Sequence, residues 1–255
     1  MKGGLNLITT QIFAHRGSAG THPENTMVAF MEAQNVGAEG IELDVQLTKD
    51  GEVVVIHDES LNRTTNGKGY VKDYTLNELK KFDASYKFTK HTGPVKIPTL
   101  REVLEMFRLN NMLLNIELKN TKFLYEGIEE KVISLVNEYQ MHNRVILSSF
   151  NHYSLVYCYQ LDSNIETAPL YRDGIYMPWV YAKAIGAKSI HPHYKAAPNI
   201  LIMASMQEGV AVRPYTVNKE KDMKKLFSVN CSSFITDVPE KAINLRNKLN
   251  QLRFS

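Results

Sequence analysis

The chain has 255 residues, a length that fits one large domain or two small ones. Its 30 lysines and arginines against 27 aspartates and glutamates leave a formal net charge of +3, which is too small to indicate a dedicated nucleic-acid-binding protein. Hydrophobic residues make up 44% and charged residues 22% of the chain, an ordinary globular composition that argues against intrinsic disorder. Two cysteines, Cys158 and Cys231, cannot build a disulfide framework, so we expect free thiols.

The sequence contains no apolar run that approaches the roughly 18 residues needed to span a membrane. The longest uninterrupted aliphatic run extends only from Val53 to Ile56. Residues 1–8 carry one lysine and an apolar segment that is too short for a secretory signal. We therefore expect a cytoplasmic protein without a membrane span.

Apolar, β-rich runs alternate with amphipathic segments along almost the whole chain. The predicted strands are 11–15, 40–47 with 53–57, 112–118, 145–149, 167–171, 188–192, 210–217 and 234–236. The predicted helices are 24–36, 100–109, 124–140, 153–161, 177–185, 199–208, 219–227 and 239–252. Helical periodicity is clearest where Leu100, Val103, Leu104 and Phe107 recur at i, i+3, i+4 and i+7.

Eight strand–helix units averaging roughly 32 residues predict an α/β fold of the (β/α)8 TIM-barrel type. An open doubly wound sheet is the alternative, but it usually has fewer strands and a glycine-rich first turn. The sequence contains neither a G-x-G-x-x-G motif nor a P-loop. Residues 58–98 interrupt the alternation and are too many for a bare loop. We expect them to form a small insertion after the second strand region, within one domain that covers residues 1–255.

Acidic and apolar residues alternate in two of the predicted strands. Because successive side chains of a strand point to opposite faces, Glu42 and Asp44 should point into the barrel together, as should Glu117 and Lys119. Buried carboxylates are costly unless a positive charge lies among them. Three inward carboxylates therefore indicate a site for a hard cation, because all-oxygen ligands suit Mg²⁺, Ca²⁺ or Mn²⁺ better than zinc. The alternation is equally compatible with solvent-facing acids or with ion pairs to Lys119 and Arg16.

Two histidines, His15 and His57, each close a predicted β-run. The carboxyl ends of barrel strands carry the chemistry of this fold, and imidazole suits proton transfer near neutral pH. The pair could act as acid and base, although a single histidine in such a place is more often structural. Arg16 offers a planar fork that matches phosphate oxygens, and Lys119 offers a second positive charge. Together they suggest an anionic substrate, most simply a phosphate ester.

Short motifs in a specific order give the chain a resemblance to the glycerophosphodiester phosphodiesterase family. The matching motifs are His15-Arg16-Gly17, Pro23-Glu24-Asn25-Thr26, Glu42-x-Asp44, Asp50-Gly51, His57-Asp58, Arg63-Thr64-Thr65 with Gly69, Glu117-x-Lys119, Thr216-Val217-Asn218 and Ile235-Thr236-Asp237. Each motif is weak alone, but their order and spacing from about residue 11 to residue 240 are specific.

The resemblance implies a TIM barrel that hydrolyses glycerophosphodiesters, such as glycerophosphocholine or glycerophosphoethanolamine, to sn-glycerol 3-phosphate and an alcohol. The implied roles are binding of a divalent metal ion by Glu42, Asp44 and Glu117, proton transfer by His15 and His57, and phosphate contact by Arg16 and Lys119. The metal is Mg²⁺ or Ca²⁺. Many bacterial members carry tryptophan where this chain has Tyr215, which leaves the preferred alcohol open. Together with His193, Tyr215 is a candidate for the pocket wall.

Several alternatives remain at this stage. A lysophospholipase-D-like activity on lipids would use the same metal and histidines with a longer apolar pocket. A non-catalytic phosphoester sensor is disfavoured, because a sensor needs no acid–base pair. The first attack on phosphorus could come from water or from the glycerol hydroxyl of the substrate, which would give a cyclic phosphate. We interpret Asn25 as the N-cap of the first helix.

Overall fold

The computed structural model describes residues 7–254. Within this range no helix combines the length and the apolar character needed to cross a membrane. The expectation that the chain has no secretory signal rests mainly on residues 1–6, which lie outside the described residues.

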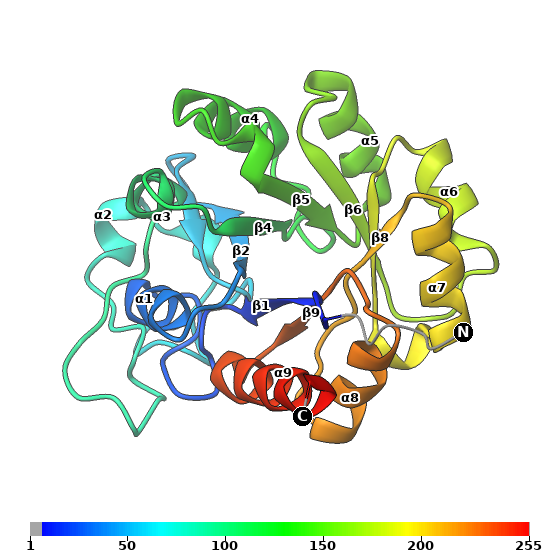
Figure 1. Ribbon diagram of the computed structural model, residues 1–255. Helices are drawn as coiled ribbons and strands as arrows, with labels where there is room; N and C mark the ends of the chain where they lie inside the picture. Colours follow the sequence, from blue (N-terminus) through cyan, green and yellow to red (C-terminus); the bar gives the residue numbers. More distant parts are fainter. Residues whose placement is uncertain (1–6, 255) are drawn as a thin grey trace, which may run out of the picture.

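Eight parallel strands form a nearly closed barrel (Figure 1), in the order β8-β7-β6-β5-β4-β2-β1-β9. Their bounds are β1 Gln11–His15, β2 Gly40–Leu47, β4 Leu113–Leu118, β5 Val145–Ser149, β6 Glu166–Tyr171, β7 Ser189–Pro192, β8 Ala211–Val212 and β9 Ser233–Thr236. Backbone hydrogen bonds complete the circle, because Ile235 N donates to Pro214 O and Val217 N donates to Ile235 O, both at 2.9 Å. The predicted TIM barrel is confirmed.

Helices surround the barrel (Figure 1). Their bounds are α1 Met27–Asn35, α3 Leu100–Phe107, α4 Ile128–Glu138, α5 His152–Leu161, α6 Pro178–Ala184, α7 Asn199–Gln207, α8 Glu220–Ser228 and α9 Pro239–Phe254. Threonines begin two of them: Thr26 accepts from the backbone of α1, and Thr99 forms a capping box with Glu102 at the start of α3. Each predicted helix is present, with ends that differ by a few residues.

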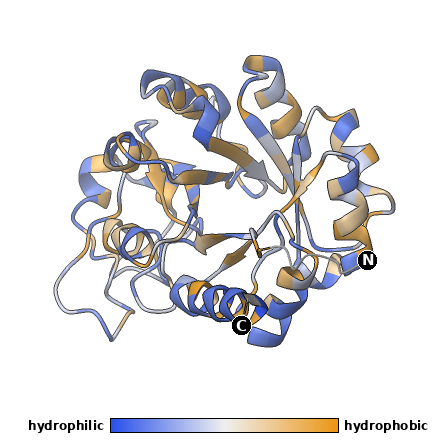
Figure 2. Cartoon of the chain, in the orientation of Figure 1, coloured by the Kyte–Doolittle hydropathy of each residue, from blue (hydrophilic) through white to orange (hydrophobic). Residues whose placement is uncertain are grey.

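The strands carry apolar side chains on both faces, and hydrophobic residues dominate them in Figure 2. Ile41, Leu43 and Val45 of β2 belong to the buried cluster that includes Phe30 of α1 and Phe107 of α3. A smaller buried cluster is formed by Phe13, Ile146, Ala168 and Ile235, from four different strands. Because the odd-numbered residues of β2 pack against helices, Glu42 and Asp44 face the other way, into the barrel.

Two strand predictions require correction. The segment predicted as strand 210–217 is a strand only at Ala211–Val212, because the chain then turns to contact both β7 and β9. The predicted strand 53–57 is β3, which spans only Val53–Val55 and runs antiparallel to β2. The β2–β3 pair is therefore a hairpin, and β3 is not one of the parallel strands of the barrel.

Residues 58–98 form the insertion that the sequence predicts. They contain the short helices η1 Val71–Asp73 and α2 Leu76–Leu79. An apolar cluster lies beneath them; it consists of Val54, Ile56, Leu61, Val71, Leu79, Ala84 and Ile97. The cluster includes Val54 of β3, so the insertion packs directly against the hairpin. Two further short helices, η2 His142–Arg144 and η3 Tyr194–Ala196, lie in connecting segments.

Candidate active site

The predicted site residues gather at the carboxyl ends of three adjacent strands. His15 ends β1 and lies opposite Glu42 of β2 in the strand register. Asp44, two residues further along β2, lies opposite Glu117 of β4. Since the side chains of a parallel pair at one register position share a face, this register brings an imidazole and three carboxylates to one end of the barrel interior.

Glu42, Asp44 and Glu117 form a buried cluster in which one carboxylate oxygen of each lies within 4.8 Å of the others. The Oδ1 atom of Asp44 is buried and has no hydrogen-bond partner. A buried polar atom without a partner is uncommon and calls for an explanation. A divalent cation would supply one, and the all-oxygen donor set suits Mg²⁺ or Ca²⁺. The residues present therefore fit a metal ion.

The three carboxyls differ in acidity. Burial raises the pKa of Glu42 well above its usual value, and the charges of Asp44 and Glu117 raise it further. Burial also raises the pKa of Glu117, against the opposing effect of Lys119. Burial opposes ionisation of Asp44 as well, but Arg16, Lys119 and His57 outweigh it and hold the pKa of Asp44 at about 2. Asp44 is therefore the carboxylate most firmly kept in its charged form.

Two cations contact the acidic cluster. Lys119 Nζ donates to Glu117 Oε1 at 2.7 Å and lies 3.7 Å from Asp44 Oδ1. Arg16 Nε lies 3.5 Å from Asp44 Oδ2, and the backbone N–H of Arg16 donates to Glu42 Oε2 at 3.0 Å. The predicted ion pairs of the acids with Lys119 and Arg16 are therefore present. The alternative, in which the acids face solvent, is wrong because all three are buried.

His15 is held by an aspartate from the opposite end of the sequence. Its Nδ1 lies 2.6 Å from Asp237 Oδ1, and Asn218 donates to the other oxygen of Asp237. A carboxylate only accepts hydrogen bonds, so Nδ1 is the donor of this pair. The other ring nitrogen, Nε2, lies 3.9 Å from Glu42 Oε2 and faces the site. Burial tends to raise the pKa of Asp237, but the bond from His15 and other contacts lower it overall.

His57 has the same arrangement, with an aspartate next to it in the sequence. Its Nδ1 lies 2.6 Å from Asp58 Oδ1, while Nε2 lies 3.2 Å from Lys119 Nζ. The sequence places His57 at the carboxyl end of a barrel strand, and this is wrong. His57 reaches the site because β3 runs back along β2, where Ile56 N donates to Asp44 O at 3.0 Å.

A chain of ion pairs connects the insertion to the site. Arg63 donates to Asp58 Oδ2 at 2.6 Å and to Glu24 Oε2 at 2.7 Å. Glu24 in turn accepts from Arg16 Nη1 at 2.7 Å. The hydrogen bond from His57, followed by the contacts of Arg63, lowers the pKa of Asp58. One arginine of the insertion thus contacts the carboxylates that hold both His57 and Arg16.

The sequence analysis interpreted Asn25 as the N-cap of the first helix, and this interpretation is wrong. The cap is Thr26, whose hydroxyl accepts from Ala29 N. Asn25 has a positive φ of 55°, a conformation that asparagine adopts more readily than most residues. In this position its side-chain amide donates to Asp44 Oδ2 at 2.8 Å. Asn25 therefore orients Asp44.

Gln46 positions His57, and sequence reasoning missed it. The Gln46 side-chain nitrogen lies within 3.1 Å of the carbonyl oxygens of Ile56, His57 and Asp58. Its side-chain oxygen accepts from Tyr125 at 2.8 Å. Gln46 is completely buried. Its inward position two residues after Asp44 follows from the strand alternation, but its partners depend on the antiparallel course of β3.

Replacing Gln46 by leucine is expected to lower the free energy of unfolding by about 1–3 kcal/mol, because buried carbonyls lose their donor without a substitute. Chemical denaturation measures this change. The matched control is Gln34→Leu on the exposed side of α1, which should stay within about 0.5 kcal/mol of the unmodified chain. Equal stability of the two variants would contradict the positioning role.

His193 and Tyr215, the candidates for the pocket wall, lie next to each other. A parallel backbone bridge joins them, and their ring centroids are 5.9 Å apart. The ring of Tyr215 also packs edge-on against Phe150, and its hydroxyl donates to Tyr171 O at 3.1 Å. Burial raises the pKa of Tyr215, and the charge of Glu117 adds to this effect. Since His193 directly follows the carboxyl end of β7, its bridge to Tyr215 places both residues at the end of the barrel that carries the acids.

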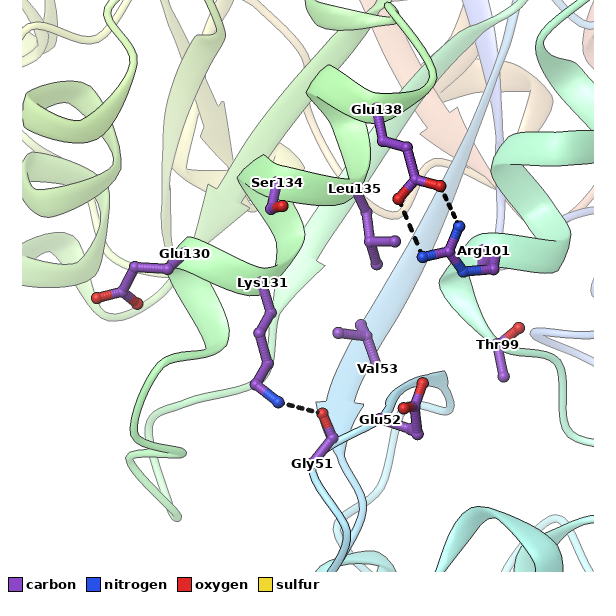
Figure 3. A pocket seen from close by; sticks show the side chains of 10 residues that line it. All are labelled: Gly51, Glu52, Val53, Thr99, Arg101, Glu130, Lys131, Ser134, Leu135 and Glu138. Carbon is purple, nitrogen blue, oxygen red and sulfur yellow. Dashed lines mark hydrogen bonds and ion pairs between the residues drawn. The ribbon is translucent and has the colours of Figure 1, made fainter.

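A separate pocket of about 390 Å³ lies between α3, α4 and the start of β3 (Figure 3). Two of its cations already have partners: Arg101 pairs with Glu138, and Lys131 donates to Gly51 O at 2.6 Å. None of the predicted site residues lines it. The candidate active site is therefore distinct from this pocket.

The chain is similar in sequence and in fold to known proteins. The model of the glycerophosphoryl diester phosphodiesterase family matches residues 15–241. A glycerophosphodiester phosphodiesterase of Bacillus altitudinis is 49% identical over 243 residues, covering 94% of this chain and 99% of that protein. One from Caldanaerobacter subterraneus is 46% identical over 239 residues, covering 94% and 98%. The structure of an Oleispira antarctica phosphodiesterase in complex with the product sn-glycerol-3-phosphate has a TM-score of 0.84 and 29% identity, covering 93% of this chain and 96% of that one.

Proposed function

The chain belongs to the glycerophosphodiester phosphodiesterase family and is a phosphodiester hydrolase; from this premise we propose that it hydrolyses small glycerophosphodiesters to sn-glycerol 3-phosphate and an alcohol. Glycerophosphocholine and glycerophosphoethanolamine are the proposed substrates. The convergence of three buried carboxylates with His15 and His57 at one end of the barrel carries the proposal. The product bound to the Oleispira antarctica phosphodiesterase supports the same product here.

Glu42, Asp44 and Glu117 are proposed to hold Mg²⁺ or Ca²⁺. Support comes from Asp44 Oδ1, which is buried without a hydrogen-bond partner, and from the all-oxygen donor set. A divalent cation bound by these carboxylates would supply Lewis-acid stabilisation of the negative charge on the substrate phosphate. Asn25 and Arg16 keep Asp44 in place and ionised, ready to act as a ligand.

Arg16 and Lys119 are proposed to bind the phosphate oxygens. Both lie beside the acidic cluster, and Arg16 Nε is buried without a hydrogen-bond partner. A buried guanidinium N–H without a partner is costly, and a phosphate oxygen would satisfy it. Glu24 accepts from Nη1 of the same side chain at 2.7 Å, so the orientation of the Arg16 fork is set before the substrate arrives.

His15 and His57 are proposed to transfer the protons. In each residue an aspartate binds Nδ1, so Nε2 is the nitrogen directed at the site. This tautomer leaves Nε2 able to accept a proton from the attacking hydroxyl, and the protonated partner histidine can deliver one to the oxygen of the leaving alcohol. Asp58 and Asp237 are therefore proposed as positioning residues that act through the histidines.

The attacking hydroxyl has two possible sources, which a modified substrate separates. If the neighbouring glycerol hydroxyl attacks first, a substrate analogue without a free 2-hydroxyl should not be hydrolysed, because no cyclic phosphate can form. If water attacks directly, the analogue should be hydrolysed at a rate close to that of glycerophosphocholine. The release of choline from both compounds, followed over time, distinguishes these results.

Product analysis tests the proposed reaction. Purified protein with glycerophosphocholine should release sn-glycerol 3-phosphate and choline in equal amounts. Release of phosphocholine and glycerol would contradict the proposal, because it requires cleavage on the other side of phosphorus. Hydrolysis of lysophosphatidylcholine without hydrolysis of glycerophosphocholine would instead support the lysophospholipase-D-like candidate. The exposed rings of Tyr153 and Tyr176, which follow the carboxyl ends of β5 and β6, favour this second candidate.

We also propose that the insertion and the barrel form a single domain, 1–255. The apolar cluster beneath the insertion includes Val54 of β3, and Arg63 of the insertion contacts Glu24 of the first loop. These contacts support a continuous structure in which the insertion is part of the active-site wall.

A further inference from the structure

Exposed apolar side chains gather at the catalytic end of the barrel. Tyr153 and Tyr176 are each 90% exposed, Leu124 is 74% exposed and Ile200 is 73% exposed. Among the side chains of residues 7–253, the other large apolar residues that are at least 64% exposed are Leu109 at 88% and Leu252 at 64%, both at the opposite end of the barrel. Isolated exposed apolar residues are normal in proteins, but several at one place indicate an interaction surface.

These four residues follow four neighbouring strands. Leu124 lies in the loop after β4, and Tyr176 lies between β6 and α6. Tyr153 lies in the first turn of α5, which follows β5, and Ile200 lies in the first turn of α7, which follows β7. Because β4, β5, β6 and β7 are consecutive in the barrel, the four side chains form an arc along one side of its mouth. The order of α5, α6 and α7 around the barrel can be followed in Figure 1. We call this arc the apolar rim.

A lysine-lined cavity continues the apolar rim beyond Ile200. It has a volume of about 740 Å³ and lies between the start of α7 and the start of α8. Lys195, Lys219, Lys221 and Lys225 line it, with Asp222 as its single acidic residue. Asp222 lies 3.6 Å from Lys225. In the described part of the chain the other three lysines form no ion pair with a carboxylate, so the cavity presents unneutralised positive charge.

A second group of cations and rings lies near the other end of the apolar rim. Lys122 Nζ lies over the rings of Tyr70 and Phe123, 5.2 and 5.6 Å from their centroids, and Lys72 Nζ lies 5.0 Å from the centroid of Phe123. Both lysines also pair with acids, Lys122 with Glu59 at 3.8 Å and Lys72 with Asp73 at 3.1 Å, so the unneutralised charge of this surface lies in the lysine-lined cavity. Phe123 is next to Leu124 in the sequence. Apolar and aromatic side chains with lysines beside them are typical of surfaces that lie in the membrane interface.

From this juxtaposition we infer that the catalytic end of the barrel is a docking surface for an anionic phospholipid bilayer. The side chains of the apolar rim enter the boundary between headgroups and acyl chains, and the lysine-lined cavity receives the phosphate of a lipid headgroup. The positive charge of the lysines favours an anionic bilayer over an apolar partner that carries no negative charge, because lysines near a membrane attract anionic lipids. Separate side chains on four successive strand–helix units also match a deformable lipid surface better than a continuous protein groove.

Docking in this orientation turns the active site toward the lipid headgroups. Resting on the proposed function, this would give the site access to glycerophosphodiester groups that still carry an acyl chain. The docking itself does not depend on catalysis. It should therefore occur in protein stripped of metal, where no phosphodiester is hydrolysed.

Vesicle co-sedimentation tests the inference. Metal-stripped protein in excess chelator is mixed with vesicles of phosphatidylcholine alone or of phosphatidylcholine with phosphatidylglycerol. We expect sedimentation with the anionic vesicles, weaker binding to the neutral ones, and loss of binding as the salt concentration rises. The double variant Lys219→Glu, Lys221→Glu should lower the partition coefficient at least about tenfold. The double variant Tyr153→Ser, Tyr176→Ser should lower it by a similar factor, about tenfold.

Matched controls come from the opposite end of the barrel. Leu109→Ser removes an equally exposed apolar side chain, and Lys183→Glu with Lys188→Glu reverses two charges there. Both controls should bind anionic vesicles as the unmodified chain does. Absence of binding by the unmodified chain would overturn the inference, as would equal losses in the controls. Dimers in solution that the tyrosine variants abolish, without vesicle binding, would assign the surface to a second copy and overturn it too.

The vesicle result and the proposed function can fail separately. Hydrolysis of soluble glycerophosphocholine without vesicle binding would contradict the docking surface and support the proposed function. Vesicle binding without hydrolysis of any glycerophosphodiester would contradict the proposed function and support the docking surface.

Discussion

Alanine at His15 or at His57 is expected to lower kcat for glycerophosphocholine by about 10²–10⁴-fold, the usual contribution of a general acid or base. Each imidazole presents Nε2 to the site while an aspartate binds its Nδ1, and neither variant leaves another imidazole in its place. The kcat of the double variant should fall by less than the product of the two single-variant factors, because the effects of residues that act as a unit are not additive. Steady-state release of sn-glycerol 3-phosphate measures the effect.

His142→Ala is the matched control for these variants. His142 belongs to η2, which precedes β5 and therefore lies at the end of the barrel away from the site. The activity of the His142→Ala variant should equal that of the unmodified chain. Near-normal rates for His15→Ala or His57→Ala would remove the acid–base assignment of that residue, provided that the variant unfolds at the same denaturant concentration as the control.

Asp44→Asn is expected to lower the activity by at least about 10³-fold, on the scale found when a group that stabilises transition-state charge is removed. Asp44 is the carboxyl with the pKa lowered to about 2, so its negative charge is present across the working pH range. Asparagine keeps the shape and one oxygen but removes this charge. The affinity for Mg²⁺ or Ca²⁺, measured by calorimetric titration, should fall together with the activity.

Asp73→Asn serves as the control for the lost charge. Asp73 lies in η1 of the insertion, and its side chain is half exposed. Its substitution should change neither metal affinity nor activity. If Asp44→Asn lost activity but bound metal with unchanged affinity, Asp44 would act on the substrate or on Arg16 instead of as a ligand.

The acidic cluster could be predicted because it depends on strand alternation alone. Placing Ile41 and Leu43 against the helices leaves Glu42 and Asp44 directed inward, and the structure has this arrangement. The same alternation puts Glu117 and Lys119 on one face of the segment that contains β4. Parallel register then pairs Asp44 with Glu117. Local periodicity was sufficient to place the acids on one face because the site lies on strands that are hydrogen-bonded neighbours, but it did not separate a buried face from a solvent-facing one.

The residues that orient the histidines could not be predicted by the same reasoning. Asp237 meets His15 only because closure of the barrel places β9 beside β1. His57 reaches the site because β3 is antiparallel, and nothing in its apolar run distinguishes that direction from a parallel strand. Gln46 binds three carbonyls of the returning chain. These contacts join loops whose relative positions follow from tertiary structure, so sequence periodicity does not contain them.

Asn25 shows how a local rule can mislead. Asparagine is a favoured N-cap residue, and its position at the start of the predicted helix 24–36 suggested that role. Thr26 caps the helix instead, which leaves the Asn25 side chain available to Asp44. The occurrence of Asn25 beside Glu24 in a motif shared with the family was the available signal of a role at the site.

Metal reconstitution tests the central claim most directly, namely that the three carboxylates hold a divalent cation required for phosphodiester hydrolysis. The protein would be stripped with chelator, dialysed and titrated with Mg²⁺ or Ca²⁺ while release of sn-glycerol 3-phosphate from glycerophosphocholine is followed. We predict negligible release without metal and recovery that saturates as one ion binds per chain, with no recovery in Asp44→Asn. Full activity in excess chelator, with no metal bound to the protein, would contradict the account.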